Sequence, residues 1–134
     1  MAGSLGNYLE NALLNHVFGK GAYTPPTIYV AVSTTDPGED GSGITEPSGN
    51  GYLRVATTAN DWTTSTAGTL HNGNALVFPK ATGSWGTLAY FALFDATKAV
   101  GGNMLAHGSL DEGKTIGNND TLEFAASALV VNMD

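Results

Sequence analysis

One pentapeptide of the chain has the residue types of a catalytic serine turn. Thr82-Gly83-Ser84-Trp85-Gly86 is close to the G-x-S-x-G pattern, which holds the nucleophilic serine of many hydrolases between a strand and a helix. Thr82 replaces the first glycine, and the apolar run that predicts a strand follows Ser84 instead of preceding it. The pentapeptide therefore predicts a turn that leads into a strand, with Ser84 as a turn residue.

The three histidines are the other candidates for proton transfer or metal binding. His16, His71 and His107 have neither the i, i+4 spacing of a helical metal pair nor the short spacing of a zinc clip. His16 falls on an apolar stripe, where a packed neutral imidazole is expected. A hydrolase would need His71 or His107 within hydrogen-bond reach of a serine or an acid. We predict no catalytic residue, no metal and no cofactor, and therefore no enzyme.

The long polar segment of residues 35–51 is the candidate for cation binding. It does not fit the calcium loop of an EF-hand, because Gly38 and Pro47 stand where ligands are required. A looser oxygen site and a solvated loop both remain open, and we expect the loop to reach a neighbouring subunit. Its acidic side chains, the candidate contacts, are Asp36, Glu39, Asp40 and Glu46.

The two tryptophans give the chain a possible carbohydrate surface. Trp62 and Trp85 could stack on sugar rings, with Asp61 as a hydrogen-bonding partner. Exposure of both rings on one surface would favour this hypothesis, and burial of both would count against it. Glycoside cleavage would need two facing acids, and the separation of Asp61 and Asp95 does not follow from the sequence.

The elements that position these residues begin with one amphipathic helix, expected over residues 4–18. Ser4 is the expected N-cap, and Gly19 and Gly21 end the helix. The apolar stripe follows the i, i+3, i+4, i+7 spacing of one helix face. Its members are Leu5, Tyr8, Leu9, Ala12, Leu13, His16 and Val17.

The remainder of the chain has the pattern of short strands joined by glycine-rich turns. We expect a single domain over residues 1–134, mainly β: an antiparallel β-sandwich or jelly-roll-like barrel with one N-terminal helix. Helices that could cover the crossovers of a parallel sheet are missing. The expected strands are residues 27–34, 52–58, 73–78, 86–95, 103–110, 120–124 and 129–133.

The strand expected over residues 85–95 is apolar on both faces. Alternation places Leu88, Tyr90 and Phe94 on the face away from the core. In an antiparallel sandwich this second face should be polar, so something must cover it. The helix of residues 4–18 and a neighbouring subunit are both open as its cover. The candidate subunit interface consists of Leu88, Tyr90 and Phe94 with Leu9 and Leu13 of the helix.

The composition excludes several classes of partner. The net charge is −7 with five Lys and Arg, so binding to nucleic acid through phosphates is not expected. No apolar run reaches the length of a membrane span, and no basic residue precedes Lys20, so we expect neither membrane insertion nor a signal peptide. Cysteine is absent, which excludes disulfides and thiolate chemistry. Only 13% of residues are charged, against about 25% typically, which favours a surface used partly against partners.

Several segments resemble a family of small virion proteins of tailed phages. The likeness extends from about Leu5 to Leu122, and members are often labelled phage tail-fiber proteins, while similar small proteins serve as capsid cement. The resemblance implies a structural virion component with a β-rich fold, assembled in many copies. The segments that carry it are residues 7–16, 23–26, 28–37, 46–55 and 78–96.

The resemblance leaves two places in the virion open. The chain lacks the heptads and repeats of a fiber stalk, so we expect a capsid cement or decoration protein on the capsid surface, assembled in the bacterial host cytoplasm. Its expected partners are the major capsid protein and a second or third copy of itself, as a homodimer or homotrimer. The alternative is a tail-fiber or baseplate domain that binds a host receptor glycan.

Overall fold

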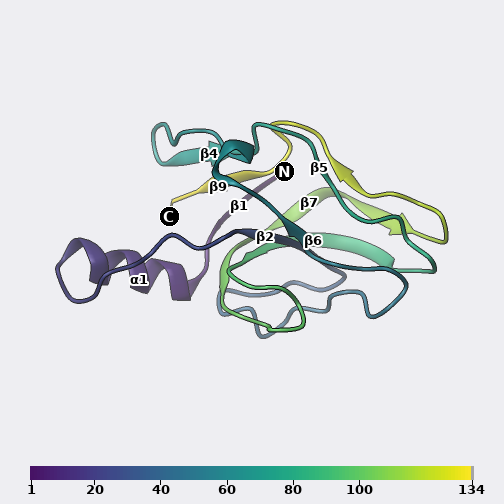
Figure 1. The fold of residues 1–134 in the computed structure, drawn as a ribbon, viewed down its shortest axis with the longest axis horizontal. Coiled ribbons are helices and arrows are strands. Elements are labelled where there is room, and N and C mark those ends of the chain that lie inside the picture. Colours follow the sequence, from purple (N-terminus) through teal and green to yellow (C-terminus); the bar gives the residue numbers. More distant parts are fainter. Residues whose placement is uncertain (134) are drawn as a thin grey trace.

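One curled sheet forms most of the protein, in a computed structural model that describes residues 1–133 (Figure 1). The seven strands follow one another in the order β3-β2-β6-β7-β1-β9-β4. They are β1 (Ala2–Leu5), β2 (Tyr29–Ser33), β3 (Val55–Ala56), β4 (Thr69–His71), β6 (Gly86–Phe94), β7 (Met104–Ile116) and β9 (Val130–Asn132). The other elements are a pair formed by β5 (Leu76–Val77) and β8 (Glu123–Phe124), the helix α1 (Asn7–Val17) and the 3-10 turn η1 (Ala59–Asp61).

The expected fold class is confirmed: the protein is mainly β, barrel-like, with one α-helix near the N-terminus. Each of the seven expected segments contains a strand, although most observed strands are shorter. The sheet is mixed, because β1 runs parallel to β9 while its other pairings are antiparallel. Among residues 1–133, no helix has the length and apolar character needed to cross a membrane.

The first strand, β1, was not expected, and it corrects the start of the helix. Ser4 lies in β1, opposite His107 of β7 and Asn132 of β9, so it does not cap the helix. The N-cap is Gly6, and the helix begins at Asn7. Gly3 of β1 lies opposite Gly108, where a side chain would collide with the backbone of the neighbouring strand. This N-terminal segment is a strand because it pairs with β7 and β9, which are distant in the sequence.

The long strand β6 is irregular where it meets β7. Leu88 lies opposite Lys114, but Tyr90 lies opposite Ser109, so β7 carries extra residues at this point. The irregularity breaks the alternation and places Leu88 in the same core cluster as Phe91. The expectation that Leu88 faces outward is therefore wrong, and its side chain is fully buried.

The second face of β6 is covered by the chain's own polar loop. Ala92 and Phe94 form a small second core with Ala31 and Met104, and Ile44 from the loop of residues 34–51 packs against it. Phe94 is buried, so the expectation that it is exposed is also wrong. The chain's own cover of this face is therefore a loop that the sequence pattern marked only as polar, and the helix expected there lies elsewhere.

A buried ion pair fastens this loop in place. Arg54 and Glu46 form a two-point contact at 2.9 and 2.8 Å, with side chains only 4% and 6% exposed. The remaining guanidinium nitrogen of Arg54 donates to the carbonyls of Ala96 and Gly101, and the guanidinium lies 3.7 Å from the ring centre of Phe94. One arginine therefore joins the covering loop, the 96–101 turn and the second core.

The ion pair can be tested by removing one charge. Arg54→Met leaves the Glu46 carboxylate buried without its partner, and we expect the free energy of unfolding in urea to fall by about 3–5 kcal/mol. The double variant Arg54→Met, Glu46→Leu leaves no buried charge and should lose less. Lys80→Met, which removes an exposed cation, is the matched control. Equal losses from Arg54→Met and Lys80→Met would contradict this role.

The tyrosine beside the ion pair gives a second test, in alkaline solution. Burial and the neighbouring Glu46 carboxylate, which accepts a hydrogen bond from the Tyr52 hydroxyl at 2.7 Å, raise the pKa of Tyr52 far above the usual value. Unfolded Tyr52 ionises near pH 10, whereas the folded residue does not, so its stabilising contribution is complete below about pH 10 and is lost above it. We expect wild type to lose about 1.4 kcal/mol more per pH unit above pH 10 than Tyr52→Phe does.

The measurement for Tyr52 is urea unfolding at a series of pH values. Tyr8→Phe changes an exposed tyrosine and serves as the matched control. If stability falls equally steeply with pH in wild type and in Tyr52→Phe, Tyr52 does not have the raised pKa.

Candidate interaction surface

The helix and the segment that returns from it project from one end of the sheet, at the left of Figure 1. We call residues 7–23 the α1 arm. None of the helical residues is fully buried, in contrast to the central strands of the sheet. Most residues of the helix are exposed to solvent.

Backbone hydrogen bonds and one histidine close the tip of the arm. Lys20 N–H donates to the Asn15 carbonyl at 2.7 Å and Gly19 N–H to the His16 carbonyl, and Gly19 takes a positive φ of 74°. This is the Schellman ending that Gly19 favours. The His16 ring is exposed, and its Nδ1 accepts a hydrogen bond from Tyr23 N–H at 3.1 Å. His16 therefore closes a turn, and the expectation that it is packed on an apolar face is wrong.

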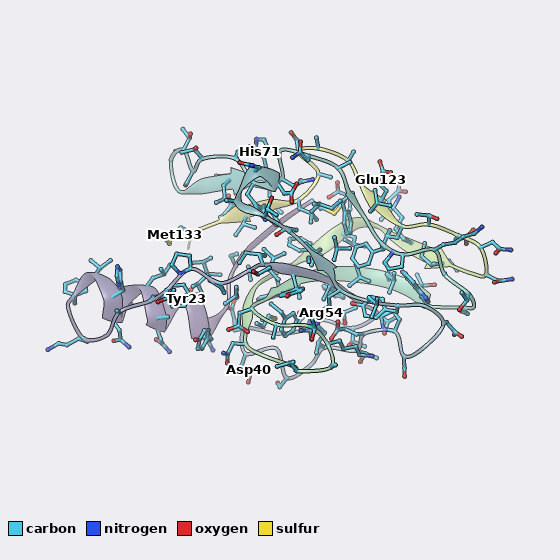
Figure 2. The ribbon with its side chains drawn as sticks, viewed as in Figure 1. Tyr23, Asp40, Arg54, His71, Glu123 and Met133 are labelled. Carbon is cyan, nitrogen blue, oxygen red and sulfur yellow. The ribbon has the colours of Figure 1, made fainter. Side chains whose placement is uncertain are left out.

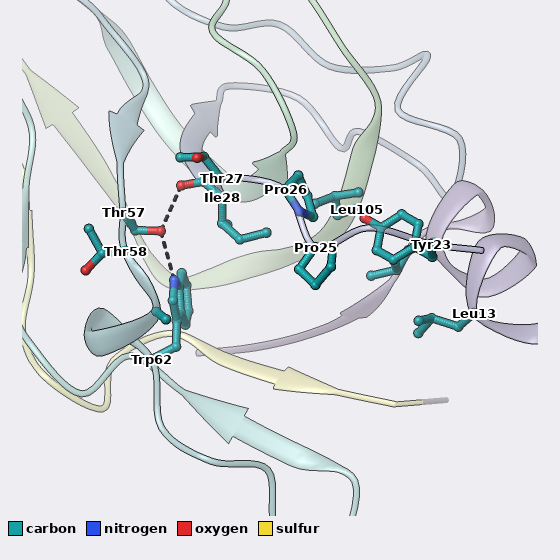
Figure 3. Close-up of a pocket in the computed structure, with 12 residues that line it drawn as sticks. Leu13, Tyr23, Pro25, Pro26, Thr27, Ile28, Thr57, Thr58, Trp62 and Leu105 are labelled. Atoms are coloured by element: carbon teal, nitrogen blue, oxygen red, sulfur yellow. Dashed lines mark hydrogen bonds between the residues drawn. The ribbon is translucent and has the colours of Figure 1, made fainter. Parts of the chain in front are cut away.

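The inner side of the arm rests on the main core along an apolar groove (Figure 3). Leu9 and Leu13 are half-buried and pack against that core, so these two residues of the expected interface contact their own chain. Trp62 lines the same groove and donates from Nε1 to Thr57 Oγ1 at 2.9 Å, and Thr57 in turn donates to the Ile28 carbonyl. The groove has a volume of about 570 Å³.

The outer side of the arm carries large apolar side chains that no other described residue covers. Leu14, Val17 and Phe18 are 59%, 74% and 72% exposed. Met133, near the C-terminus, is 62% exposed and lies beside the helix across a second groove. Exposed apolar groups gathered on one projecting element are typical of a protein–protein contact. The residues lining this outer groove are Leu5, Glu10, Asn11, Leu13, Leu14, Val17 and Met133.

The charge distribution sets the arm apart from the rest of the protein. Glu10 is the only acid in residues 1–35 of the sequence, and Lys20 is the only lysine or arginine there. The net charge of −7 therefore lies entirely in residues 36–134. The arm is a neutral, apolar region attached to a strongly acidic body.

The remaining residues of the expected subunit interface lie elsewhere in the fold. Leu88 and Phe94 are buried, as described above, while Tyr90 is half-buried. Tyr90 lines a shallow hollow together with Asp36 and His107, on the side of the sheet that faces the 35–43 loop. The structure does not bring these three strand residues together as one exposed surface.

The acidic loop residues are mostly used within the loop itself. Asp36 and Asp40 accept hydrogen bonds from the backbone of Gly38 and Ser42, and the latter bond lowers the pKa of Asp40. Glu46 is buried against Arg54, so it is not available to a neighbouring subunit. Glu39 is exposed, with its carboxylate 3.8 Å from His107 Nε2. Within residues 1–133, no three His, Asp or Glu side chains are grouped as metal ligands.

The two tryptophans do not share an exposed surface. Trp85 is 3% exposed, donates from Nε1 to the Asn50 carbonyl, and packs edge-on against Tyr52. Trp62 is half-buried under the arm. Asp61 lies at the end of η1, where its carboxylate accepts from Thr58 N–H and Asn74 Nδ2, and these hydrogen bonds lower its pKa. A sugar cannot stack on Trp85 without opening the core.

The polar groups considered for catalysis have structural partners in this fold. Ser84 Oγ accepts a hydrogen bond from Gly86 N–H, which closes the turn that leads into β6. His71 Nδ1 lies 3.2 Å from the Asn72 carbonyl. His107 Nε2 is buried without a hydrogen bond, and the group facing it is the Glu39 carboxylate. His71 Nδ1 thus faces a backbone carbonyl and His107 Nε2 a carboxylate, and neither of these contacts is to a serine hydroxyl.

The exposed apolar residues of this candidate surface that sequence analysis missed are Leu14, Phe18 and Met133. Leu14 lies off the apolar stripe of the helix, and Phe18 follows its last turn. A large apolar residue off the stripe is the signal that could have identified Leu14, because a helix buried on one face only does not require it.

Comparison with known proteins gives one family. The sequence model of a family described as podophage GP4 fiber I protein gp80 matches residues 4–132, nearly the whole chain. No curated protein matches the chain.

The exposure of the arm makes a prediction about stability. Val17→Ser and Phe18→Ser change side chains that lie in solvent, so we expect the free energy of unfolding to stay within about 0.5 kcal/mol of wild type. Leu105→Ala, at a buried position beneath the arm, should cost about 2–5 kcal/mol. Urea unfolding of the isolated protein measures both. A large loss from Val17→Ser would mean that the arm packs against its own chain.

Proposed function

The chain belongs to the family of podophage GP4 fiber I protein gp80, a family of structural virion proteins, and from this we propose that it is a subunit of the phage fiber apparatus. It acts by attachment: the α1 arm docks on a neighbouring virion protein, and the acidic body remains in solvent. The observation that supports this proposal is the exposed apolar outer side of the arm, at Leu14, Val17 and Phe18.

The mechanism of attachment is burial of apolar surface. Transfer of exposed apolar side chains from water into a contact stabilises the assembly by roughly 25 cal/mol per Å² buried. Each arm is small, so a single contact is weak. Repetition of the contact over many copies in a symmetric assembly multiplies its effect, because each bound copy holds its neighbours close.

A capsid cement protein that binds the major capsid protein is the second candidate. The observation that favours it is the shape of the described chain, which has one helix of eleven residues and no stalk-like element within residues 1–133. The same arm would then dock on the capsid surface, and the acidic body would face away from the packaged DNA. Both candidates use the same interaction surface, and they differ in its partner.

A receptor-binding role through the tryptophans receives little support from the geometry. Burial of Trp85 leaves Trp62 alone, and Trp62 lies half-covered beneath the arm with its Nε1 already donating to Thr57. A fiber subunit that anchors or joins other fiber proteins accords better with this arrangement than a glycan-binding tip.

The location of the protein in purified virions tests the proposal. Labelled antibody or cryo-electron microscopy should find the protein at the tail, as expected for a fiber subunit. Signal spread over the head would support the cement candidate, and absence of the protein from virions would contradict both.

A variant phage links the location to the arm. Val17→Asp places a charge on the outer side of the arm, and we expect at least a tenfold loss of the protein from virions, equivalent to about 1.4 kcal/mol of docking energy. Val100→Asp, at a similarly exposed valine of the 96–103 turn, is the matched control and should be incorporated normally. Normal incorporation of Val17→Asp would mean that the arm is not the docking surface.

A further inference from the structure

We propose that the outer sides of two α1 arms pack against each other, antiparallel, around a twofold axis that passes near Leu14. The neighbouring virion protein on which the arm docks is thus a second copy of this chain. This inference rests on the proposed function only in that the arm is the assembly surface.

The outer side of the arm has the shape that such a contact requires. It presents a ridge formed by Leu14 and Val17, and beside the ridge a groove whose far wall is Met133. A twofold axis between the ridge and the groove places the ridge of each copy in the groove of the other, because an isologous contact uses the same patch twice. Phe18 directly follows Val17, and its ring is exposed. It supplies an aromatic anchor at each end of the contact between the two copies.

The distribution of charge favours association of two copies through their arms and disfavours association through the rest of the molecule. Two copies each carry a net charge of −7, so most approaches bring like charges together. The arm contains one acid and one lysine, so two arms meet without net repulsion. A neutral apolar region on an otherwise acidic protein is therefore the place where copies can associate.

The antiparallel direction also pairs the two charges of the arm. Glu10 lies four residues before Leu14, about 6 Å along the helix axis, and Lys20 lies in the turn just beyond the helix end. With the axis near Leu14, Glu10 of each copy approaches Lys20 of the other. The antiparallel packing also aligns the two helix dipoles favourably, with each helix end near the opposite end of its partner.

Salt dependence distinguishes a second copy from a different partner. Added salt screens the repulsion between two acidic bodies, so self-association should strengthen as ionic strength rises. Docking of the acidic protein on a basic surface would weaken under the same change. The sign of the effect can be measured without knowing any other virion protein.

Sedimentation equilibrium of the purified full chain tests the dimer. We expect wild type to form dimers below about 100 µM, and Val17→Asp to raise the dissociation constant at least tenfold, whereas Val100→Asp, which adds the same charge elsewhere, leaves it unchanged. Val17→Ser removes the apolar contact without adding charge and should also weaken the dimer. Urea unfolding of each variant verifies that the fold is intact.

A charge exchange tests the antiparallel register. Glu10→Lys alone places two lysines together at each end and should weaken the dimer, and the double variant Glu10→Lys, Lys20→Glu should restore it. If the double variant is no better than Glu10→Lys, the antiparallel register is wrong.

The results also separate this inference from the proposed function. A wild-type chain that stays monomeric at about 100 µM at all salt concentrations overturns the dimer. If Val17→Asp is at the same time lost from virions, the arm docks on another virion protein and the proposed function stands. If the purified chain forms dimers but the protein is absent from virions, the proposed function is overturned and the inference of a dimer stands.

Discussion

The buried pairing of Arg54 with Glu46 is the interaction on which the arrangement of this protein depends. The central strand β6 is apolar on both faces, and one face is covered by the main core of the curled sheet. The other face has no second sheet to cover it, so the chain places a polar loop there and holds it with one arginine. A loop rich in glycine and acids contributes little apolar surface, which is why a satisfied ion pair and several carbonyl contacts are needed to hold it.

The cover of the second face explains the exposure of the helix. Since the loop of residues 34–51 occupies that face, α1 is not required there and packs on the main core through Leu9 and Leu13. The helix projects from the sheet (Figures 1 and 2). Its side that bears Leu14 and Val17 is left in solvent. An apolar element that the fold does not use is available for contacts with other subunits.

Membership in a family of phage virion proteins accords with this division of the molecule. An acidic body keeps the protein soluble before assembly, and a neutral apolar arm limits the directions from which another subunit can dock. The polar groups that resembled catalytic or metal-binding residues serve turns instead, as Ser84 and His16 illustrate. The proposed attachment through the arm depends on packing of apolar surface and on exclusion of like charge.

The sequence by itself determined the mainly β class, the positions of seven strands, the end of the helix at Gly19 and the turn at Ser84, because these depend on local alternation and turn chemistry. The prediction that Leu88 faces outward was wrong, because its direction depends on the register between β6 and β7. The strand β1 was not predicted, because it forms only by pairing with β7 and β9. Leu14 off the stripe is a sequence signal for a second apolar side of the helix, but the tertiary structure decided that this side stays exposed. Which segment covers an apolar face depends on contacts between distant residues, such as Arg54 with Gly101, and no local pattern encodes them.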